Sequence, residues 1–363
     1  MKHTLSNSFP VRRQQGASQW ILISAIAVLA IAVLLFISNW PARSEKPGVP
    51  VTDVGEASPK MESISTRIKW FTYASYIGTY VAKDWGFWEK LGLDVTIQEG
   101  GPQVDATKLV AGGANHFGIA GGDQLLVARS KGLPVVAIAV IMQETPAGFM
   151  VLADSDIHGM RDFPGHRIRV VPGHNTEIEY RAVMAKLGID TDTAMKEVVN
   201  FSEFQLLLAG EVDIEPIYLN NQPATARSRD IEFRTFTPTD YGVRSYGNVY
   251  FTTEKMIEER PELVQRFLDG LLQGWKGTRE QPERAVDSML KYGRHLKRDV
   301  ELDKLRDTWP LVKEKHGRIG WMERARWVEV LDVLRTTGII KSDVDVDAVF
   351  DTRFVKTHYR DHD

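Results

Sequence analysis

Short apolar segments alternate with helix-like segments along most of this chain. Strands are predicted where apolar or alternating residues run together, and helices where apolar residues recur three or four positions apart. The expected strands are residues 67–73, 93–98, 116–120, 135–142, 149–152, 167–171, 197–201, 214–219 and 233–237. From Thr253 to Gly338 the pattern becomes almost entirely helical and is interrupted by Pro261, Pro282 and Pro310.

The alternation restarts after Gly159, so the pattern predicts two blocks of strands and helices followed by a helical segment. The expected fold class is therefore α/β, with two open, mostly parallel sheets that carry helices on both faces. Two such blocks suggest two lobes. In this topology a ligand lies at the carboxyl ends of the strands, in the crevice between the lobes.

The N-terminus carries a different pattern. The run from Ile21 to Ser38 contains no charged residue and lies between Trp20 and Trp40. Its length suits a helix that crosses a bilayer, and aromatic residues are common at both membrane interfaces. The alternative is a cleaved signal peptide, for which residues 42–44 form only a weak cleavage site. On either interpretation the residues from 66 onward are exported.

These features predict a topology for the N-terminal region. Residues 1–18 would be a cytoplasmic tail, because positive charge is slightly biased toward that side, and residues 19–40 would be an anchor in the lipid bilayer. Residues 41–65 carry scattered prolines among Ser, Glu, Lys and Gly, which is typical of a flexible linker. Such a linker would allow the globular part to reach a neighbouring protein in the same membrane.

Composition narrows the function classes. The chain of 363 residues contains no cysteine, which excludes disulfides, thiolate zinc sites, iron–sulfur ligation, a cysteine nucleophile and a lipidated N-terminal cysteine. Its formal net charge of -3 gives no support to a nucleic-acid-binding surface. No catalytic, nucleotide-binding or metal-binding motif is present. We therefore expect a protein that is not an enzyme and that holds neither a cofactor nor a metal.

Polar and aromatic residues follow several of the predicted strands, at the ends that would converge on the crevice. The aromatic rings offer stacking faces, and the amides and carboxylates offer hydrogen bonds to a planar polar ligand. Core packing or helix capping remains the alternative for individual members. The candidate ligand-binding residues are Trp70, Tyr73, Tyr76, Asp123, Gln143, Asn175, Glu177, Tyr218 and Asn221.

Several segments carry a resemblance to a known family. In chain order they include Trp70-Phe71, GTYVAK at 78–83, GGANHFGIA at 112–120, YLNNQP at 218–223 and Gly274-Trp275. Through these segments, residues 66–355 resemble the periplasmic-type solute-binding proteins of ABC importers, in the branch that binds the thiamine pyrimidine precursor or riboflavin. The chain also resembles the eukaryotic thiamine-pyrimidine synthases that share this fold.

The resemblance implies a bilobal type II periplasmic-binding-protein fold whose lobes close on a ligand like a hinge. The first lobe would comprise residues 66–152 plus 248–363, and the second lobe residues 153–247. Positions that match the family's binding site are Trp70, Tyr73, Asp123, Glu177, Tyr218 and Asn221.

The expected function is that of a membrane-anchored substrate-binding protein. It would deliver a small planar heteroaromatic nutrient, of the thiamine-pyrimidine-precursor type, to an ABC permease in the bacterial inner membrane, with its globular part in the periplasm. A protein that binds riboflavin, a sulfonate or nitrate is an alternative. A synthase-like enzyme or a ligand-sensing module is an alternative of another class, although the synthases need a cysteine-rich iron motif that this chain lacks.

Overall fold

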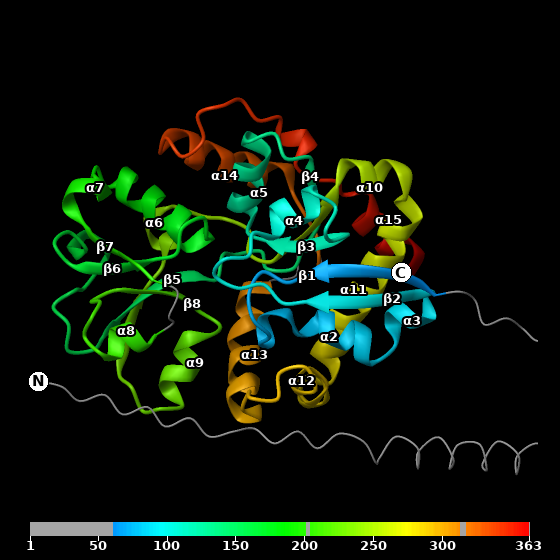
Figure 1. Cartoon of the computed structure of the whole chain (residues 1–363), viewed down its shortest axis with the longest axis horizontal. Helices are drawn as coiled ribbons and strands as arrows, with labels where there is room; N and C mark the ends of the chain where they lie inside the picture. Colours follow the sequence, from blue (N-terminus) through cyan, green and yellow to red (C-terminus); the bar gives the residue numbers. More distant parts are fainter. Residues whose placement is uncertain (1–60, 201–203, 313–316, 363) are drawn as a thin grey trace, which may run out of the picture. The chain divides into compact units, whose positions relative to one another are not determined.

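The computed structural model describes residues 61–200, 204–312 and 317–362, which belong to one compact unit, Ser58–Asp363 (Figure 1). The predicted tail, the predicted anchor at residues 19–40 and nearly all of the predicted linker lie outside the described residues. Within the described ranges no helix is both long and apolar enough to cross a bilayer. The membrane anchor therefore stays a prediction.

The first sheet has five strands in the order β2-β1-β3-β10-β4. Its central strand β1 runs parallel to β2 and β3, whereas β10 runs antiparallel to β3 and β4. The expectation of mostly parallel sheets is therefore only partly correct, because β10 returns from the second sheet and enters the first in the opposite direction. The strands are β1 (Glu62–Arg67), β2 (Leu93–Gln98), β3 (Phe117–Ala120), β4 (Val135–Val140) and β10 (Val249–Thr253).

The second set of strands forms two smaller sheets (Figure 1). In one, β5 lies between β8 and β9 and is antiparallel to both, and in the other β6 is parallel to β7. A bridge between Ile168 and Ile214 connects β6 to the segment before β8. The strands are β5 (Ala147–Leu152), β6 (Arg167–Val170), β7 (Lys196–Val199), β8 (Glu215–Tyr218) and β9 (Phe233–Phe236).

The chain passes between the two sets of strands after β4 and again before β10. We name the part built on the first sheet lobe 1 and the part that contains β5 to β9 lobe 2. The predicted lobe boundary at residue 152 is too late, because residues 147–152 form β5 and pair with β8 and β9. The apolar pattern of this segment cannot reveal which sheet it joins.

The first strand also begins earlier than expected. We predicted a strand over 67–73, but β1 pairs in register with β2 from Glu62↔Leu93 to Arg67↔Gln98. Residues 62–65, which we placed in the linker, are therefore part of lobe 1. Lys69 and Trp70 lie beyond the end of β1 but are buried. The apolar sequence of their segment therefore reflects burial in the protein and not pairing in the sheet.

Helices of lobe 1 come from both ends of the described chain. The 3-10 turn η1 (Ala74–Tyr76) leads into α2, which packs beside α11 with Gly274 against the backbone of Gly78. Figure 1 shows the C-terminal helices, coloured yellow to red, around the first sheet. The helices are α2 (Ile77–Asp84), α3 (Phe87–Lys90), α4 (Ala106–Ala111), α5 (Gly122–Ser130), α10 (Glu254–Glu259), α11 (Pro261–Glu280), α12 (Pro282–Leu290), α13 (Arg298–Val312), α14 (Arg324–Thr336) and α15 (Arg353–His362).

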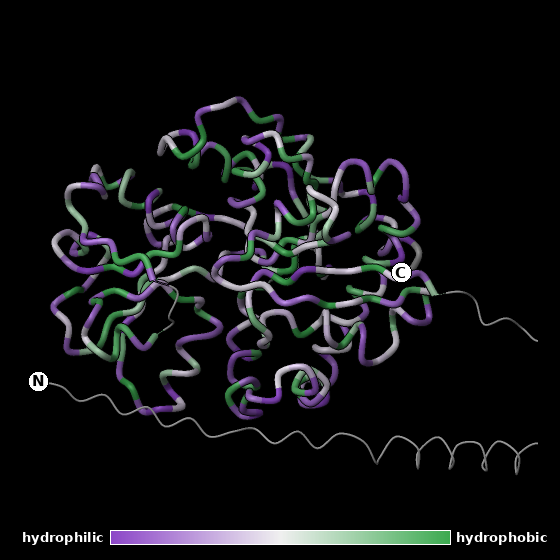
Figure 2. The backbone as a smooth tube through the Cα atoms, viewed as in Figure 1, coloured by the Kyte–Doolittle hydropathy of each residue, from purple (hydrophilic) through white to green (hydrophobic). Residues whose placement is uncertain are grey.

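Lobe 2 has its own hydrophobic core between its strands and α6. Phe149, Ile168 and Tyr180 are among the side chains that are almost completely buried there. Figure 2 shows hydrophobic stretches concentrated inside each lobe and hydrophilic ones along the outer loops. The helices of lobe 2 are α6 (Asn175–Lys186), α7 (Thr191–Ala194), α8 (Gln205–Leu208) and α9 (Gln222–Arg227).

Candidate functional site

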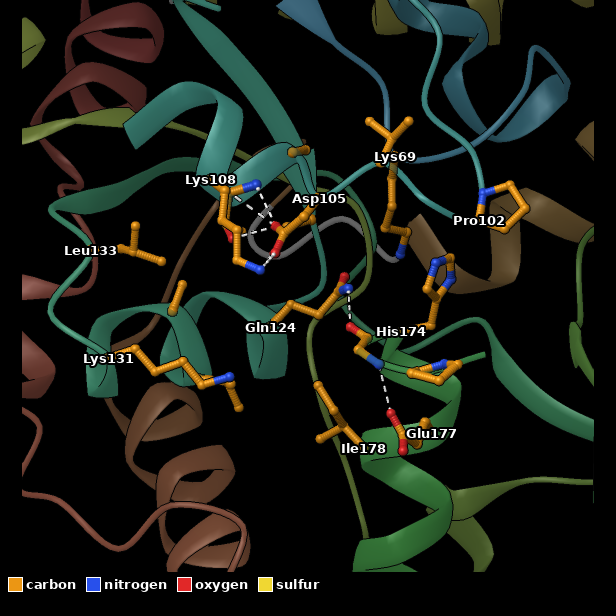
Figure 3. A pocket seen from close by; sticks show the side chains of 18 of the residues that line it. Lys69, Pro102, Asp105, Lys108, Gln124, Lys131, Leu133, His174, Glu177 and Ile178 are labelled. Atoms are coloured by element: carbon orange, nitrogen blue, oxygen red, sulfur yellow. Dashed lines mark hydrogen bonds and ion pairs between the residues drawn. The ribbon is translucent and has the colours of Figure 1, made fainter. Parts of the chain in front are cut away.

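The end of β1 delivers Lys69 and Trp70 into the interior. Two backbone hydrogen bonds hold this segment, from Ile68 N to the Gln98 carbonyl at 3.0 Å and from Gly100 N to the Trp70 carbonyl at 3.0 Å. A Cβ at Gly100 would lie 2.4 Å from the carbonyl oxygen of Lys69, so only glycine fits there. The backbone of Lys69 is therefore fixed, and its side chain points into the space between the lobes (Figure 3).

A cavity of about 540 Å³ lies between the lobes. Lobe 1 contributes Lys69, residues 102–108 and Gln124, and lobe 2 contributes residues 172–174, among others. The side chain of Gln124 crosses the gap and donates a hydrogen bond to the Gly173 carbonyl at 3.0 Å. Figure 3 shows Lys69, Gln124 and His174 extending toward the same space from different elements. The volume is sufficient for a small heterocyclic molecule.

Lys69 lines this cavity, and the two buried carboxyl groups whose charges act on it belong to Asp123 and Glu179, which are not lining residues; the three are here named the charged trio. Their exposed fractions are 5%, 1% and 1%. Lys69 Nζ, Asp123 Oδ2 and Glu179 Oε2 each lack a hydrogen-bond partner among the described residues. An unsatisfied buried polar group costs about 1–3 kcal/mol, and more when it is charged. Atoms of this kind in a cleft are the partners that a bound polar ligand would satisfy.

The neighbours of the trio hold it in position. Glu179 Oε1 accepts hydrogen bonds from Thr145 Oγ1 at 2.6 Å and from Asn175 Nδ2 at 3.5 Å. The Tyr218 hydroxyl donates to Asn175 Oδ1, and Lys69 Nζ lies 4.7 Å from the centre of the Tyr218 ring. The network therefore links the end of β1 in lobe 1 to α6 and β8 in lobe 2.

Burial shifts the proton affinity of all three groups. Desolvation lowers the pKa of Lys69 to about 8, while the charges of Asp123 and Glu179 oppose that shift. Desolvation raises the pKa of Asp123 to about 6, and Lys69 opposes that shift. The pKa of Glu179 is raised, first by desolvation and then by the negative charge of Asp123. Near neutral pH the trio therefore favours a charged lysine, a charged aspartate and a glutamate biased toward its neutral form.

His174 lines the cavity and contacts Trp70, which is not itself a lining residue. Their rings meet edge-on, with centroids 4.9 Å apart. Burial and the nearby charge of Lys69 lower the pKa of His174 to about 4, so its imidazole is neutral at physiological pH. His174 adds a ring and a polar edge to the cavity wall without adding charge.

The predicted site residues fall into three groups. Asp123, Asn175 and Tyr218 belong to the trio and its network, and Trp70 directly follows Lys69, but none of these four residues lines the cavity. Tyr73 and Tyr76 contact each other with ring centroids 5.2 Å apart, and both are buried in the core of lobe 1. Burial is the main cause that raises the pKa of Tyr76, and the nearby Tyr73 adds to it. Neither of these two rings lines the cavity.

Gln143, Glu177 and Asn221 have other partners. The Gln143 amide donates to the carbonyls of Val140 and Trp321, which ties β4 to the C-terminal segment. Asn221 occupies the N-cap position of α9 and does not line the cavity.

Glu177 does line the cavity, but its two carboxylate oxygens accept from Gly173 N at 2.6 Å and from Arg181 Nε at 3.0 Å. Its role at the cavity edge is therefore to hold the turn that precedes α6.

Reasoning from the sequence missed Lys69, Thr145 and Glu179. Glu179 is four residues after Asn175, so both lie on one face of α6, whereas Glu177 lies on another. That spacing was the available signal. The lysine in the otherwise apolar and aromatic segment after β1 was a second signal. Across the described residues, no group of three or more His, Asp or Glu side chains is placed to hold a metal ion.

Comparison with solved structures identifies the class of fold. The aliphatic sulphonate binding protein SsuA from Escherichia coli superposes with a TM-score of 0.62 at 18% identity, over 79% of this chain and 91% of its own. At this identity the match establishes the fold alone, which is the α/β fold of periplasmic binding proteins. Residues 74–285 match the family described as NMT1/THI5 like. This is more than half of the chain, so the chain belongs to that family, as the resemblance in the sequence indicated.

Curated relatives match most of the chain. The formylaminopyrimidine-binding protein of Halalkalibacterium halodurans is 25% identical over 289 residues, 78% of this chain and 88% of its own length. The riboflavin-binding protein RibY of Chloroflexus aurantiacus is 23% identical over 349 residues, covering 91% and 98%. A 4-amino-5-hydroxymethyl-2-methylpyrimidine phosphate synthase of Legionella pneumophila is 23% identical over 62% of this chain and 74% of its own length.

Proposed function

We propose that this chain is the substrate-binding protein of an ABC importer and that it binds a small planar heteroaromatic nutrient between its lobes. The observation that carries the proposal is the charged trio, whose unsatisfied atoms lie beside a cavity lined by both lobes. The names of the two binding-protein relatives support a pyrimidine or a flavin as the ligand. A binding protein needs no catalytic group, and the proposal assigns none.

The charge of the site favours an aminopyrimidine over an anion. Asp123 and Glu179 can accept hydrogen bonds from amino groups, whereas a sulfonate or nitrate would be repelled by an ionised Asp123. His174 supplies an aromatic edge at the cavity wall, with the Trp70 ring in contact with it. A thiamine pyrimidine precursor therefore fits the site better than a sulfonate, and riboflavin remains the second candidate because of its relative's name.

We further propose that residues 19–40 hold the protein in the bacterial inner membrane, with the globular part in the periplasm and an ABC permease as its partner. The uncharged run from Ile21 to Ser38 supports this. Alkaline carbonate extraction of membranes tests it. The full chain should stay in the membrane pellet, and the unit from Ser58 onward should be released. Release of both would contradict the anchor.

The binding proposal is tested by isothermal titration calorimetry on the unit from Ser58 onward, which is compact by itself. The ligands are formylaminopyrimidine, riboflavin and an alkanesulfonate. We expect micromolar or tighter binding of the pyrimidine, weaker binding of riboflavin, and none of the sulfonate. Binding no tighter than millimolar for all three ligands would contradict the proposal.

An enzyme of pyrimidine synthesis is the second candidate, favoured by the synthase relatives alone. The absence of cysteine argues against it, because the resemblance to the eukaryotic synthases implies a cysteine-rich iron motif. Incubation of the protein with iron and pyridoxal phosphate, followed by mass spectrometry of the protein, separates the two candidates. Loss of mass at a histidine would indicate the enzyme.

A further inference from the structure

We propose that Lys69 is a specificity-determining residue, which selects a neutral heterocycle that presents a hydrogen-bond acceptor beside an amino donor. The inference rests on the proposed function, because it describes the ligand of the same cleft. It goes further by assigning the two halves of the ligand's polar edge to different members of the charged trio.

The first step concerns the position of Lys69. Its backbone is held on both sides by the bonds of Ile68 N and Gly100 N, so the lysine cannot withdraw by a shift of the chain. Its side chain is 5% exposed and lines the cavity. An ammonium group has three N–H donors, and none of them has a partner among the described residues. These donors are therefore available to an acceptor atom of a ligand.

The second step concerns the groups that face the ammonium. Asp123 approaches from α5, Glu179 from α6, His174 from the turn before α6, and the face of the Tyr218 ring from β8. The ring interacts with the charge but accepts no conventional hydrogen bond. The Asp123 carboxylate neutralises the charge at a distance, and Asp123 and Glu179 each retain an oxygen without a partner among the described residues. The trio thus offers donors at one point and acceptors at two others.

The third step matches a ligand to this arrangement. A ring nitrogen next to an exocyclic amino group places an acceptor beside a donor, which satisfies Lys69 and a carboxylate together. A ring that lacks the acceptor would leave the buried ammonium unsatisfied. Sites built to hydrogen-bond a group discriminate strongly against analogues without it, because their buried polar atoms are then left unpaired.

The test compares two substitutions and two ligands in the full-length protein in detergent micelles. The probes are 4-amino-5-hydroxymethyl-2-methylpyrimidine and its analogue in which carbon replaces the ring nitrogen next to the amino-bearing carbon. The variants are Lys69→Met and, as a control, Lys291→Met. Lys291 does not line the cavity, is mostly exposed and pairs with Asp84 at 2.8 Å.

We expect wild type and Lys291→Met to bind the pyrimidine at least about tenfold more tightly than its carbon analogue. Lys69→Met should bind the pyrimidine at least about tenfold more weakly than wild type and should discriminate between the probes by less than about twofold. If Lys69 had only a structural role, Lys69→Met would bind both probes more weakly, and the ratio of the two affinities would stay unchanged. An unchanged ratio therefore overturns the inference while the proposed function stands.

If wild type binds none of these probes, formylaminopyrimidine, riboflavin or an alkanesulfonate, the proposed function fails and this inference fails with it. If Lys69→Met does not fold, as judged by loss of cooperative melting in circular dichroism, the pH dependence of wild-type binding decides. Affinity for the pyrimidine should fall by at least about fivefold between about pH 7 and pH 9.5 as Lys69 loses its proton, with no comparable fall for the carbon analogue. Equal pH dependence for both probes overturns the inference.

Discussion

The indole ring of Trp70 meets the imidazole ring of His174 edge-on, with ring planes at 86° to each other. Trp70 follows β1 in lobe 1, and His174, which lines the cavity, precedes α6 in lobe 2, so this contact joins the lobes next to the cavity. Separation of the lobes would break the contact. We therefore expect the pair to connect ligand binding to the closure of the cleft.

Replacing Trp70 by alanine should weaken ligand binding. If an aromatic face contributes as it does to stacked bases, the loss is about 1–3 kcal/mol of binding free energy. Isothermal titration calorimetry with the pyrimidine probe measures it. Trp85→Ala is the control, because Trp85 packs against Arg284 and donates to Ser288, whereas Trp70 contacts the cavity-lining His174. Unchanged affinity in Trp70→Ala would remove this ring from the site.

Asp123→Asn should stabilise the fold at neutral pH. The pKa of Asp123 is raised in the folded state to about 6 from an ordinary value of 3.8. Between these values the native state binds more protons than the unfolded state, so this residue lowers stability as pH rises. The amide cannot ionise, and its oxygen can still accept from Gln124 N. We expect about 1–3 kcal/mol more free energy of unfolding at about pH 7.5.

Urea unfolding of wild type and variant at about pH 4 and about pH 7.5 measures this effect. The gain should be small at the lower pH, because about pH 4 lies close to the ordinary pKa of 3.8 and little of the cost of ionising Asp123 has developed there. Asp94→Asn on the exposed side of β2 is the control and should leave the pH dependence unchanged. A gain of the same size at both pH values would contradict the assignment.

The ion pair between Arg169 and Glu215 should be essential to lobe 2. The Arg169 Nε donates to both carboxylate oxygens of Glu215 at 2.9 Å, and the two side chains are 4% and 0% exposed. Arg169→Met would leave a buried carboxylate without this partner, at a cost of about 3–5 kcal/mol in unfolding free energy.

A neighbouring pair supplies the control. Arg167 and Asp213 make a similar bidentate contact one pleat earlier, but their side chains are 41% and 29% exposed. Arg167→Met should therefore change stability little, because exposed pairs are screened by water and salt. Equal destabilisation of the two variants in urea unfolding would show that burial does not set the cost.

Gly274→Ala should destabilise lobe 1 through a steric effect. A Cβ at this position would lie 2.2 Å from the carbonyl oxygen of Gly78, so α11 would have to move away from α2. Overpacking of this kind costs about 1–3 kcal/mol. Lys276→Ala is the control in the same helix, because Lys276 is exposed. Thermal unfolding of both variants measures the difference, and equal melting temperatures would contradict the close packing.

The local pattern of apolar and polar residues was sufficient to predict individual elements of secondary structure. The alternation of 93–98 gave β2, and the segment Gln222–Arg227 gave α9, because each is set by residues next to one another in the chain. The strand before Trp70 was misplaced, since its extent depends on pairing with β2. Likewise β5 was assigned to the wrong lobe, because its partners β8 and β9 come later in the chain.

The candidate site is limited in the same way. The ends of strands converge on a cleft, so the positions of Trp70, Asp123, Asn175 and Tyr218 near the contact of the lobes could be expected, and their role in binding stays a prediction. Gln143 also lies at the end of a predicted strand, but its amide group donates hydrogen bonds to the carbonyls of Val140 and Trp321. A side chain that ends a strand can bind either a ligand or the protein itself, and the sequence does not distinguish the two.

The sequence by itself determined the alternation of strands and helices, the family, and the absence of any cysteine-based chemistry. Only the tertiary structure decided that Lys69 and Glu179 join Asp123 in one buried cluster. The reason is physical: periodicity records whether each position faces the interior of its own element. Which buried charges share a cavity depends on how elements far apart in the chain pack together, and the proton affinities of Lys69, Asp123 and Glu179 depend on that packing.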